Sequence, residues 1–271
     1  MYDNRACYDA HPMDEHQLRE VLDFAVESAQ LAGAFTLGFY NSGTPHELKR
    51  DGTPVTAADR GAEERLRKRI GAAYPDHGIV GEEFGETKGT SPARWILDPI
   101  DGTVSFICGV PLYCVLVGLE YAGEMVAGVI HMPALGETVY AAKGIGCWWN
   151  GRRARVSDAR TLAESRLCTC GSKLLVDNGR GREFERVRDR CLLDRGWSDG
   201  YAYALVATGR AEVVMDPLMQ IWDNAACLPV VVEAGGSFTD WAGKPTHTAK
   251  EALATNGHVL PEVLAAIAGA K

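Results

Sequence analysis

Five strand-like segments in the first half of the sequence place the strongest constraint on the fold. They are rich in apolar residues and cover residues 77–83, 94–101, 112–121, 125–133 and 137–143. The last three are separated only by the short turn sequences AGE and ALG. Because short glycine-containing turns between apolar runs are typical of β-hairpins, these three segments predict consecutive antiparallel strands.

Helical patterns lie on both sides of these strands. Apolar residues recur at helical spacing over residues 14–40, where Asp14 and Gln17 resemble a capping box. A second helix is predicted to begin after Thr56, with Asp59 three residues later. The C-terminal part alternates in type, with helical patterns at 200–209, 223–236 and from about 261, and strand patterns at 211–216 and 237–241. Helices and strands that interleave in both halves predict a layered α+β or α/β architecture.

Length and charge limit the classes of function. The 271 residues are enough for one large domain or two small ones, and the polar segment 155–165 is a candidate connection between two subdomains. The formal net charge of -8 disfavours sequence-independent binding to nucleic-acid phosphates. A small anionic substrate would therefore need local positive charge, which bound metal cations can supply.

The sequence carries no pattern of export or membrane insertion. No segment reaches the roughly 20 apolar residues that span a bilayer, and the N-terminal sequence lacks an apolar core of signal-peptide length. We therefore expect a cytoplasmic protein without a membrane partner. The eight cysteines include no CxxC pair and stand mostly in apolar segments, which predicts reduced, buried thiols.

Acidic residues stand at the ends of several apolar elements. The segment WILDPIDGTVSFICG, residues 95–109, ends its apolar run with Asp98 and Asp101. Glu82 and Asp223 occupy similar places at the ends of other elements. Carboxylates that lie close together repel one another and raise one another's pKa unless a cation lies between them. Because Mg²⁺ prefers oxygen ligands, these residues are candidate metal ligands.

The residues that follow the first of the paired aspartates suit a tight turn. Pro99 fixes φ, so that both aspartates and the Ile100 carbonyl can converge on one or two metal ions. Gly102 permits a close approach of the backbone, and the amides of Gly102 and Thr103 can receive phosphate oxygens at a helix start. The turn can therefore hold a cation and an anion together.

The same residues also have ordinary structural explanations. Carboxylates at strand ends can be surface groups in turns, and Asp223 can cap the helix that follows it. Asp59 can be no more than a negative charge in the first turn that interacts favourably with the dipole of its own helix. Glu83 fits a local hydrogen bond better than a direct metal ligand.

Four motifs occur in order along the chain: DGTPVTAAD, GIVGEEFG, WILDPIDGTVSFICGVPLY and WDNAACLPVVVEAGG. With them the sequence resembles the inositol monophosphatase superfamily of metal-dependent phosphatases over almost the whole chain. The stretch WSDGYAYALVATGRAEVVMDPLMQIWD is most similar to the histidinol-phosphatase branch. The resemblance implies an α+β fold, a layered α-β-α-β-α sandwich of the inositol monophosphatase and fructose-1,6-bisphosphatase type. It also implies an N-terminal subdomain, residues 1–155, that carries most metal ligands, a C-terminal subdomain, residues 156–271, that completes the site, and a homodimer.

The resemblance implies roles for individual residues. The implied ligands of two or three Mg²⁺ ions are Glu82, Asp98, the Ile100 carbonyl, Asp101 and Asp223. Thr103, held by Asp59 and helped by Glu82, would position a metal-bound water for in-line attack on phosphorus. The implied phosphate contacts are Asp101, Gly102, Thr103 and Val104.

The substrate has to be inferred from other residues. Histidinol phosphate carries an amine and an imidazole that can be protonated, so its pocket should present carboxylates that the metal does not use. Asp199 and Asp216 are candidates, although Asp199 can instead cap a helix and Asp216 ends a strand. Arg195 can contact phosphate or substrate, or be a solvated surface residue.

The leading hypothesis is a Mg²⁺-dependent phosphomonoesterase that converts L-histidinol phosphate to L-histidinol. One alternative keeps the chemistry and changes the ester to inositol monophosphate or another sugar phosphate, and a second is a non-catalytic metal- or phosphate-binding protein. Cys108 and Cys114 flank the candidate site where the branch carries small or polar residues, which points to altered packing or sensitivity to oxidation. The loop 46–56 is expected to become ordered when metal and substrate bind, with Lys49 and Asp51 as mobile parts.

Overall fold

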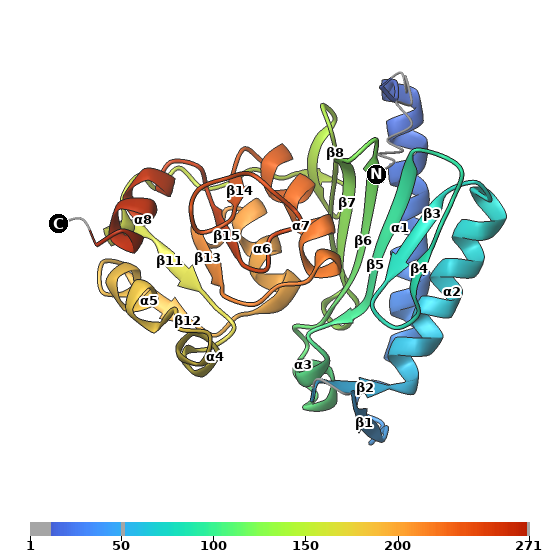
Figure 1. Ribbon diagram of the computed structural model, residues 1–271, viewed down its shortest axis with the longest axis horizontal. Coiled ribbons are helices and arrows are strands. Elements are labelled where there is room, and N and C mark those ends of the chain that lie inside the picture. The colour runs from blue at the N-terminus through green and yellow to red at the C-terminus, as the bar shows by residue number, and fades with distance from the viewer. Residues whose placement is uncertain (1–11, 50–51, 270–271) are drawn as a thin grey trace, which may run out of the picture.

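Two β-sheets alternate with three layers of helices in the structure, a computed structural model that describes residues 12–49 and 52–269. In Figure 1 a pair of long helices covers an eight-stranded sheet, a second pair of helices separates this sheet from a five-stranded one, and short helices cover the far face. This arrangement confirms the α-β-α-β-α sandwich.

The eight-stranded sheet has the order β10-β9-β8-β7-β6-β5-β3-β4, and its pairs are antiparallel except for β3 with β5. The hairpins predicted for residues 112–143 are confirmed, and their strands span residues 114–142. The strands are β3 (Gly78–Gly81), β4 (Gly85–Thr87), β5 (Ala93–Asp101), β6 (Cys114–Tyr121), β7 (Glu124–Met132), β8 (Glu137–Ala142), β9 (Gly146–Trp149) and β10 (Arg152–Arg153).

Two long helices, α1 (Glu15–Leu37) and α2 (Ala57–Ala73), cover the outer face of this sheet. Each begins with a capping box, that of Asp14 with Gln17 as predicted and that of Thr56, the predicted N-cap, with Asp59. The caps satisfy amides that have no acceptor within the helix, and the apolar faces of both helices pack on the sheet in one core cluster. The sequence therefore fixes where both helices begin.

The segment between these helices is more regular than expected. It forms a two-stranded hairpin, β1 (His46–Leu48) and β2 (Pro54–Thr56). In its turn the Lys49 N–H donates to the Thr53 carbonyl at 2.7 Å, and Gly52, with a φ of 85°, donates to the Lys49 carbonyl at 3.0 Å. Asp51 lies outside the described residues, and ordering of this segment on binding stays a prediction.

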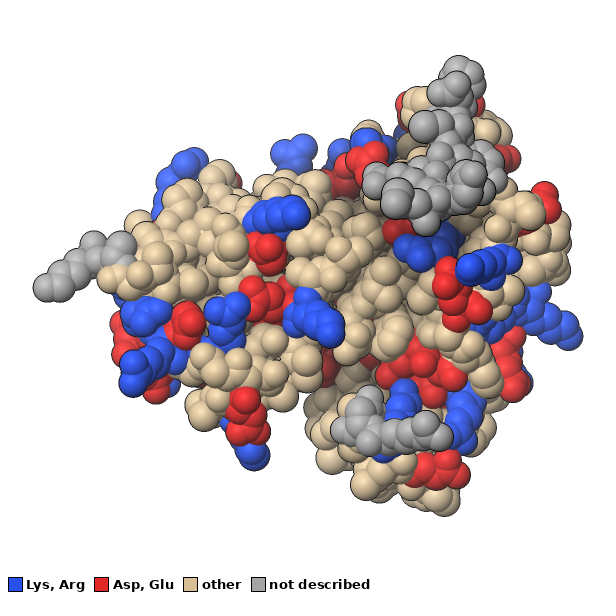
Figure 2. Space-filling view, viewed as in Figure 1, with Lys and Arg blue, Asp and Glu red and all other residues tan. Residues whose placement is uncertain are grey.

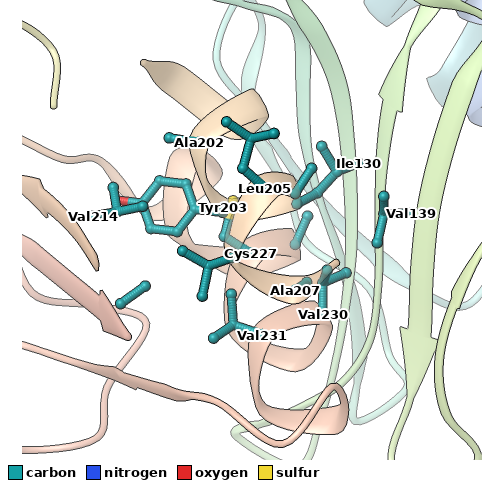
Figure 3. Close-up of a cluster of buried hydrophobic side chains, with 14 of the residues drawn as sticks. Ile130, Val139, Ala202, Tyr203, Leu205, Ala207, Val214, Cys227, Val230 and Val231 are labelled. Atoms are coloured by element: carbon teal, nitrogen blue, oxygen red, sulfur yellow. The ribbon is translucent and has the colours of Figure 1, made fainter. Parts of the chain in front are cut away.

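The middle layer consists of α6 (Asp199–Ala207) and α7 (Ile221–Glu233), and its apolar side chains contact both sheets. Figure 3 shows this core, in which Val139 from β8 and Val214 from β13 lie on opposite sides of the helices. A fully buried side chain of this size stabilises the fold by roughly 1.5–3 kcal/mol. Gly128 in β7 allows the close approach of α7, because a Cβ there would lie 2.3 Å from the Ala226 carbonyl oxygen.

The five-stranded sheet has the order β12-β11-β13-β15-β14, with β11 parallel to both of its neighbours. Its strands are β11 (Arg166–Cys168), β12 (Leu193–Arg195), β13 (Val213–Asp216), β14 (Ser237–Thr239) and β15 (Ala252–Thr255). The outer helices are α4 (Ser172–Asp177), α5 (Gly181–Arg188) and α8 (Leu260–Ile267), and the remaining helical segments are α3 (Thr103–Ile107), η1 (Pro133–Leu135) and η2 (Leu162–Glu164).

The proposed division into residues 1–155 and 156–271 stays a prediction. The strands of the first sheet end at Arg153 and those of the second begin at Arg166. However, α6 and α7 from the second half pack against the first sheet, so one core cluster contains residues of both halves. In residues 12–49 and 52–269, no helix is long and apolar enough to cross a membrane.

The cysteines were predicted to be reduced and buried, and the structure confirms their burial only in part. All seven in the described ranges are free, and Cys7 lies outside them. Those that are buried are Cys114, Cys147, Cys168 and Cys227. Cys108 is exposed, because the short helix α3 that precedes it stands at the edge of the fold.

Candidate active site

A cavity of about 400 Å³ opens where the two halves of the chain meet. It receives residues from the end of β5, from α3, and from the starts of α6 and α7. Figure 2 shows the molecule hollowed between the regions of α3 and α4, with acidic side chains visible inside the hollow. Among the described residues, six carboxylates line the cavity: Glu82, Asp98, Asp101, Asp199, Asp216 and Asp223.

Asp98 and Asp101 reach the same cavity because β5 is irregular between them. In a regular strand, residues three apart point to opposite faces of the sheet. The pairing of β5 with β6 shifts register between the two aspartates, where Pro99 and Ile100 stand. Asp98 is 2% exposed and accepts the Ile100 N–H at 3.0 Å, and Asp101 is 9% exposed and accepts the Gly200 N–H.

Asp223 joins these two aspartates from the first turn of α7. Its Oδ2 accepts the Gln220 N–H at 2.7 Å in a capping box, so the helix cap is Gln220. The alternative that Asp223 itself is the cap is therefore wrong. One carboxylate oxygen from each of Asp98, Asp101 and Asp223 lies within 4.8 Å of the others.

The electrostatics of these three aspartates fit a divalent cation. Burial, followed by the charges of Glu82 and Asp101, raises the pKa of Asp98 well above its usual value. Burial, followed by the charges of Asp199 and Asp223, raises the pKa of Asp101 well above its usual value, and burial raises the pKa of Asp223 to about 7. Three carboxylates that raise one another's pKa need positive charge between them to stay ionised at neutral pH. An all-oxygen set of this kind suits Mg²⁺.

Glu82 completes the acidic wall from the turn between β3 and β4. Its Oε1 accepts a hydrogen bond from Lys49 Nζ at 2.7 Å, and the same ammonium lies 2.6 Å from Glu83 Oε1. Burial raises the pKa of Glu83 to about 7, against the lowering effect of Lys49. Glu83 does not line the cavity among the described residues and bonds locally, as expected.

Thr103 stands at the start of α3 beside the aspartates. Its hydroxyl lies 3.1 Å from the Ile100 carbonyl oxygen and 3.4 Å from Asp59 Oδ1. Asp59 is 1% exposed, and its Oδ2 accepts both the N–H and the hydroxyl of Thr56, at 2.8 and 2.6 Å. Asp59 therefore serves its own helix cap and also contacts Thr103, so the two explanations of this residue are compatible.

Residues at the start of α3 line the same cavity. Gly102 precedes this helix with a φ of 84°, and Val104, which is 61% exposed, lies in its first turn. Both line the cavity. The first amides of a helix have no acceptor within it, so they are available to an anion. A Cβ at Gly102 would lie 2.7 Å from Asp199 Oδ2, so only glycine fits this contact.

Asp199 and Asp216 approach the cavity from the C-terminal half. Asp199 is the first residue of α6, with a φ of 59°, and Ser198 is the residue before the helix, so the alternative that Asp199 is the cap is wrong. Asp216 ends β13 and accepts the Tyr203 hydroxyl at 2.7 Å and the Cys170 N–H at 3.3 Å. Burial raises the pKa of both carboxylates, that of Asp199 to about 6.

The structure does not bring Arg195 to the cavity. It lies at the end of the edge strand β12, is exposed, and donates to the Asp194 carbonyl at 2.7 Å. Within the described residues of one chain, Arg195 does not line the cavity, and its contact with substrate stays a prediction. The short three-residue strand β12 leaves its side chains at the sheet edge, away from the carboxylates.

Several cavity residues were missed by the sequence analysis. They are Cys170, Leu174, Tyr203, Leu218 and Met219. They belong to the second half of the chain, where Leu174 and Tyr203 lie in the short helices α4 and α6 and the others lie in connecting segments, so that packing and not a local pattern brings them to the cavity. Their side chains line the cavity together with Asp216, which the sequence analysis did name as a candidate.

Comparison with known proteins identifies the relatives of this chain. A model of the inositol monophosphatase family matches residues 17–270. The chain belongs to the inositol monophosphatase family. It is therefore a metal-dependent phosphoric monoester hydrolase.

Individual members of the inositol monophosphatase family resemble the chain over most of their length. It is 43% identical over 249 residues to a histidinol-phosphatase from Chlorobaculum parvum, covering 92% of this chain and 96% of that one. It is 37% identical to a fructose-1,6-bisphosphatase/inositol-1-monophosphatase from Thermotoga maritima, covering 78% and 80%. Its fold matches the extragenic suppressor protein suhB from Bartonella henselae with a TM-score of 0.86 and 32% identity, covering 92% and 98%.

Proposed function

We propose that the chain is a Mg²⁺-dependent phosphatase that hydrolyses L-histidinol phosphate to L-histidinol and phosphate. The observation that carries the reaction is the cluster of Asp98, Asp101 and Asp223, whose oxygens lie within 4.8 Å of one another beside Thr103. The substrate is supported by the likeness to a histidinol-phosphatase across 92% of the chain.

The proposed ligands of two or three Mg²⁺ ions are Glu82, Asp98, the Ile100 carbonyl, Asp101 and Asp223. When bound, Mg²⁺ neutralises phosphate charge and makes a bound water far more acidic than bulk water. The chain therefore needs no nucleophilic side chain of its own. Burial of Asp98 and Asp101 keeps their attraction for a cation strong, because the surroundings screen it less than water does.

Residues beside the metal ligands orient the reacting groups. The Thr103 hydroxyl can donate its single hydrogen to Asp59 or to the Ile100 carbonyl and still accept a hydrogen bond from a water. Together with Glu82 it would aim that water at phosphorus. Amides at the start of α3, including those of Gly102 and Val104, would hold the phosphate oxygens. Phosphoryl transfer depends mainly on such positioning and on charge neutralisation.

The residues that the C-terminal half contributes to the cavity suit the leaving alcohol of histidinol phosphate. Asp199 and Asp216 can accept hydrogen bonds from a protonated amine, and the Tyr203 hydroxyl holds Asp216 in place. Leu174 and Leu218 add apolar surface of the kind that packs against an imidazole ring. A polyol such as inositol would instead require polar partners around its ring.

A second candidate keeps the chemistry and changes the ester. The likeness to a fructose-1,6-bisphosphatase/inositol-1-monophosphatase at 37% identity favours an inositol or sugar phosphate as this alternative. A non-catalytic binding protein is disfavoured, because the chain retains Thr103, which would position the water, together with the complete set of proposed metal ligands.

Phosphate release on a panel of esters tests the proposal. The panel contains histidinol phosphate, inositol 1-phosphate, fructose 1,6-bisphosphate and a 3′-phosphonucleotide, each with Mg²⁺, and Asp98→Asn is the inactive control. We expect kcat/KM for histidinol phosphate to exceed the others at least about tenfold, a transition-state difference of about 1.4 kcal/mol. A smaller preference would refute the substrate, and no hydrolysis of any ester would favour the binding protein.

A homodimer and a cytoplasmic location belong to the same proposal. The family resemblance implies the homodimer, and the sequence pattern favours the cytoplasmic location. Light scattering on the purified protein tests the first, and a mass near 29 kDa, that of one chain, would contradict it.

A further inference from the structure

Glu63 is a fully buried carboxylate that no sequence motif indicated. It lies in the second turn of α2, and its side chain is 0% exposed. A buried charge is costly unless its oxygens are hydrogen-bonded. Here Oε2 accepts the Glu83 N–H at 2.7 Å, and Oε1 accepts the Phe84 N–H at 3.3 Å and Arg67 Nε at 2.7 Å.

Two of these donors belong to the turn that carries Glu82. The turn joins β3 to β4, and its amides at Glu83 and Phe84 point to Glu63 instead of pairing within the sheet. The Glu82 N–H donates to the Leu97 carbonyl at 3.3 Å, which ties the same turn to β5. The backbone on both sides of the Glu82 side chain is therefore held by specific acceptors.

Two neighbours of Glu63, Gly81 and Arg67, support its contact with the turn between β3 and β4. A Cβ at Gly81 would lie 2.0 Å from Glu63 Oε1, so glycine is required for the carboxylate to reach the turn. Arg67, one helical turn further along α2, neutralises Glu63 and also donates to Thr87 Oγ1 at 3.1 Å and to the Gly85 carbonyl. Glu63 and Arg67 thus hold the turn and the strand β4 that follows it from one helix.

The same helix face also supports Thr103. Asp59 stands four residues before Glu63, so the two carboxylates lie on one face of α2. Asp59 contacts the Thr103 hydroxyl at 3.4 Å, whereas Glu63 holds the turn of Glu82. α2 therefore sets the position of two separate parts of the site relative to each other.

We propose that Glu63 is a positioning residue that fixes Glu82 for metal binding through the amides of Glu83 and Phe84. The inference rests on the proposed function, because that proposal makes Glu82 a Mg²⁺ ligand. Residues that orient metal ligands from behind typically change metal affinity about 10- to 100-fold when they are replaced. Glu63 acts on the ligand and does not itself line the cavity among the described residues.

The variant Glu63→Gln tests this role. Glutamine has the same shape but only one acceptor oxygen, so its NH₂ group would face at least one of the three donors. We expect the dissociation constant for Mg²⁺, measured by calorimetry on the full chain, to rise about 10- to 100-fold. At saturating Mg²⁺, kcat should return to within about threefold of the parent, since every ligand remains.

The exposed neighbour Glu64 provides a matched control. Glu64→Gln makes the same change of charge on the same helix and should leave Mg²⁺ affinity within about twofold of the parent. A folded Glu63→Gln protein with Mg²⁺ affinity within about twofold of the parent would overturn the inference alone. A parent protein that binds no Mg²⁺ would overturn the proposed function and this inference together.

Hydrogen exchange gives a measurement that does not depend on the variant folding. In the unmodified metal-free protein, the amides of Glu83 and Phe84 should exchange at least about tenfold more slowly than in an unstructured peptide. Exchange of the Glu83 amide at the peptide rate would show that Glu63 does not hold the turn, and would overturn the proposal.

Discussion

Replacing Asp216 by asparagine should weaken hydrolysis of histidinol phosphate selectively. Asp216 is 3% exposed, lines the cavity, and accepts the Tyr203 hydroxyl at 2.7 Å and the Cys170 N–H at 3.3 Å. Asparagine has nearly the same size as aspartate, so the cavity keeps its shape. The variant removes the negative charge that we propose to pair with the substrate amine. It also turns one acceptor oxygen into an NH₂ group, whose hydrogen bond the Tyr203 hydroxyl oxygen can accept while the remaining oxygen keeps the Cys170 N–H.

The size of the effect follows from the loss of one charge-assisted hydrogen bond. Such a bond to a charged group contributes about 1.5–3 kcal/mol, which corresponds to a loss of roughly 10- to 150-fold in kcat/KM. The assay compares histidinol phosphate with p-nitrophenyl phosphate, whose leaving group carries no amine. We expect kcat/KM for p-nitrophenyl phosphate to change by less than about threefold.

The control for Asp216→Asn is Asp194→Asn. Asp194 is exposed on β12 and does not line the cavity among the described residues, so its replacement should leave both substrates unaffected. Equal losses for both substrates in Asp216→Asn would refute the reasoning, because Asp216 would then support the site as a whole. Unchanged hydrolysis of histidinol phosphate would refute the contact itself.

Three other predictions concern the metal site. Thr103→Ala should lower kcat about 100-fold or more with Mg²⁺ affinity nearly unchanged, while Thr103→Ser retains most activity; equal losses in both would contradict the hydroxyl's role. Metal-free protein should lose thermal stability as pH rises from about 4 to 7. The pKa of Asp223 is raised from 3.8 to about 7 in the folded protein, so over this range the folded chain keeps a proton that the unfolded chain releases. A scan in EDTA that shows the same pH dependence in Asp223→Asn would count against this. Gly200→Ala should weaken Mg²⁺ binding about tenfold, because its Cβ would lie 2.9 Å from Asp101 Oδ2, whereas Gly196→Ala, which meets nothing within 4 Å, should not.

Features with local causes were predictable from the sequence. The capping box of Thr56 and Asp59 depends on residues three apart, and it lies where the sequence places it. The strand that ends in Asp98 and Asp101 was indicated by its apolar run, and the structure extends it over Ala93–Asp101. The short turns of the hairpins 114–142 likewise fix which strands pair.

Features that depend on packing were not predictable. The Glu83 N–H and the Glu63 carboxylate that accepts it are 20 residues apart, and the Gly200 N–H and Asp101 are 99 residues apart. No periodic pattern connects such pairs, because they meet only after the layers have packed. Arg195 shows the opposite case. It is close to Asp199 in the sequence, but it does not line the cavity in the part of the chain that the structure describes.

The central claim is that carboxylates from separate elements form one metal centre at which a phosphate ester is hydrolysed. Anomalous diffraction from crystals grown with Mn²⁺ and inorganic phosphate would test it most directly. We predict an anomalous peak in contact with Asp98, Asp101 and Asp223, and phosphate oxygens beside the amides of Gly102 and Thr103. A cavity without an anomalous peak at these aspartates, or phosphate bound away from α3, would contradict the account.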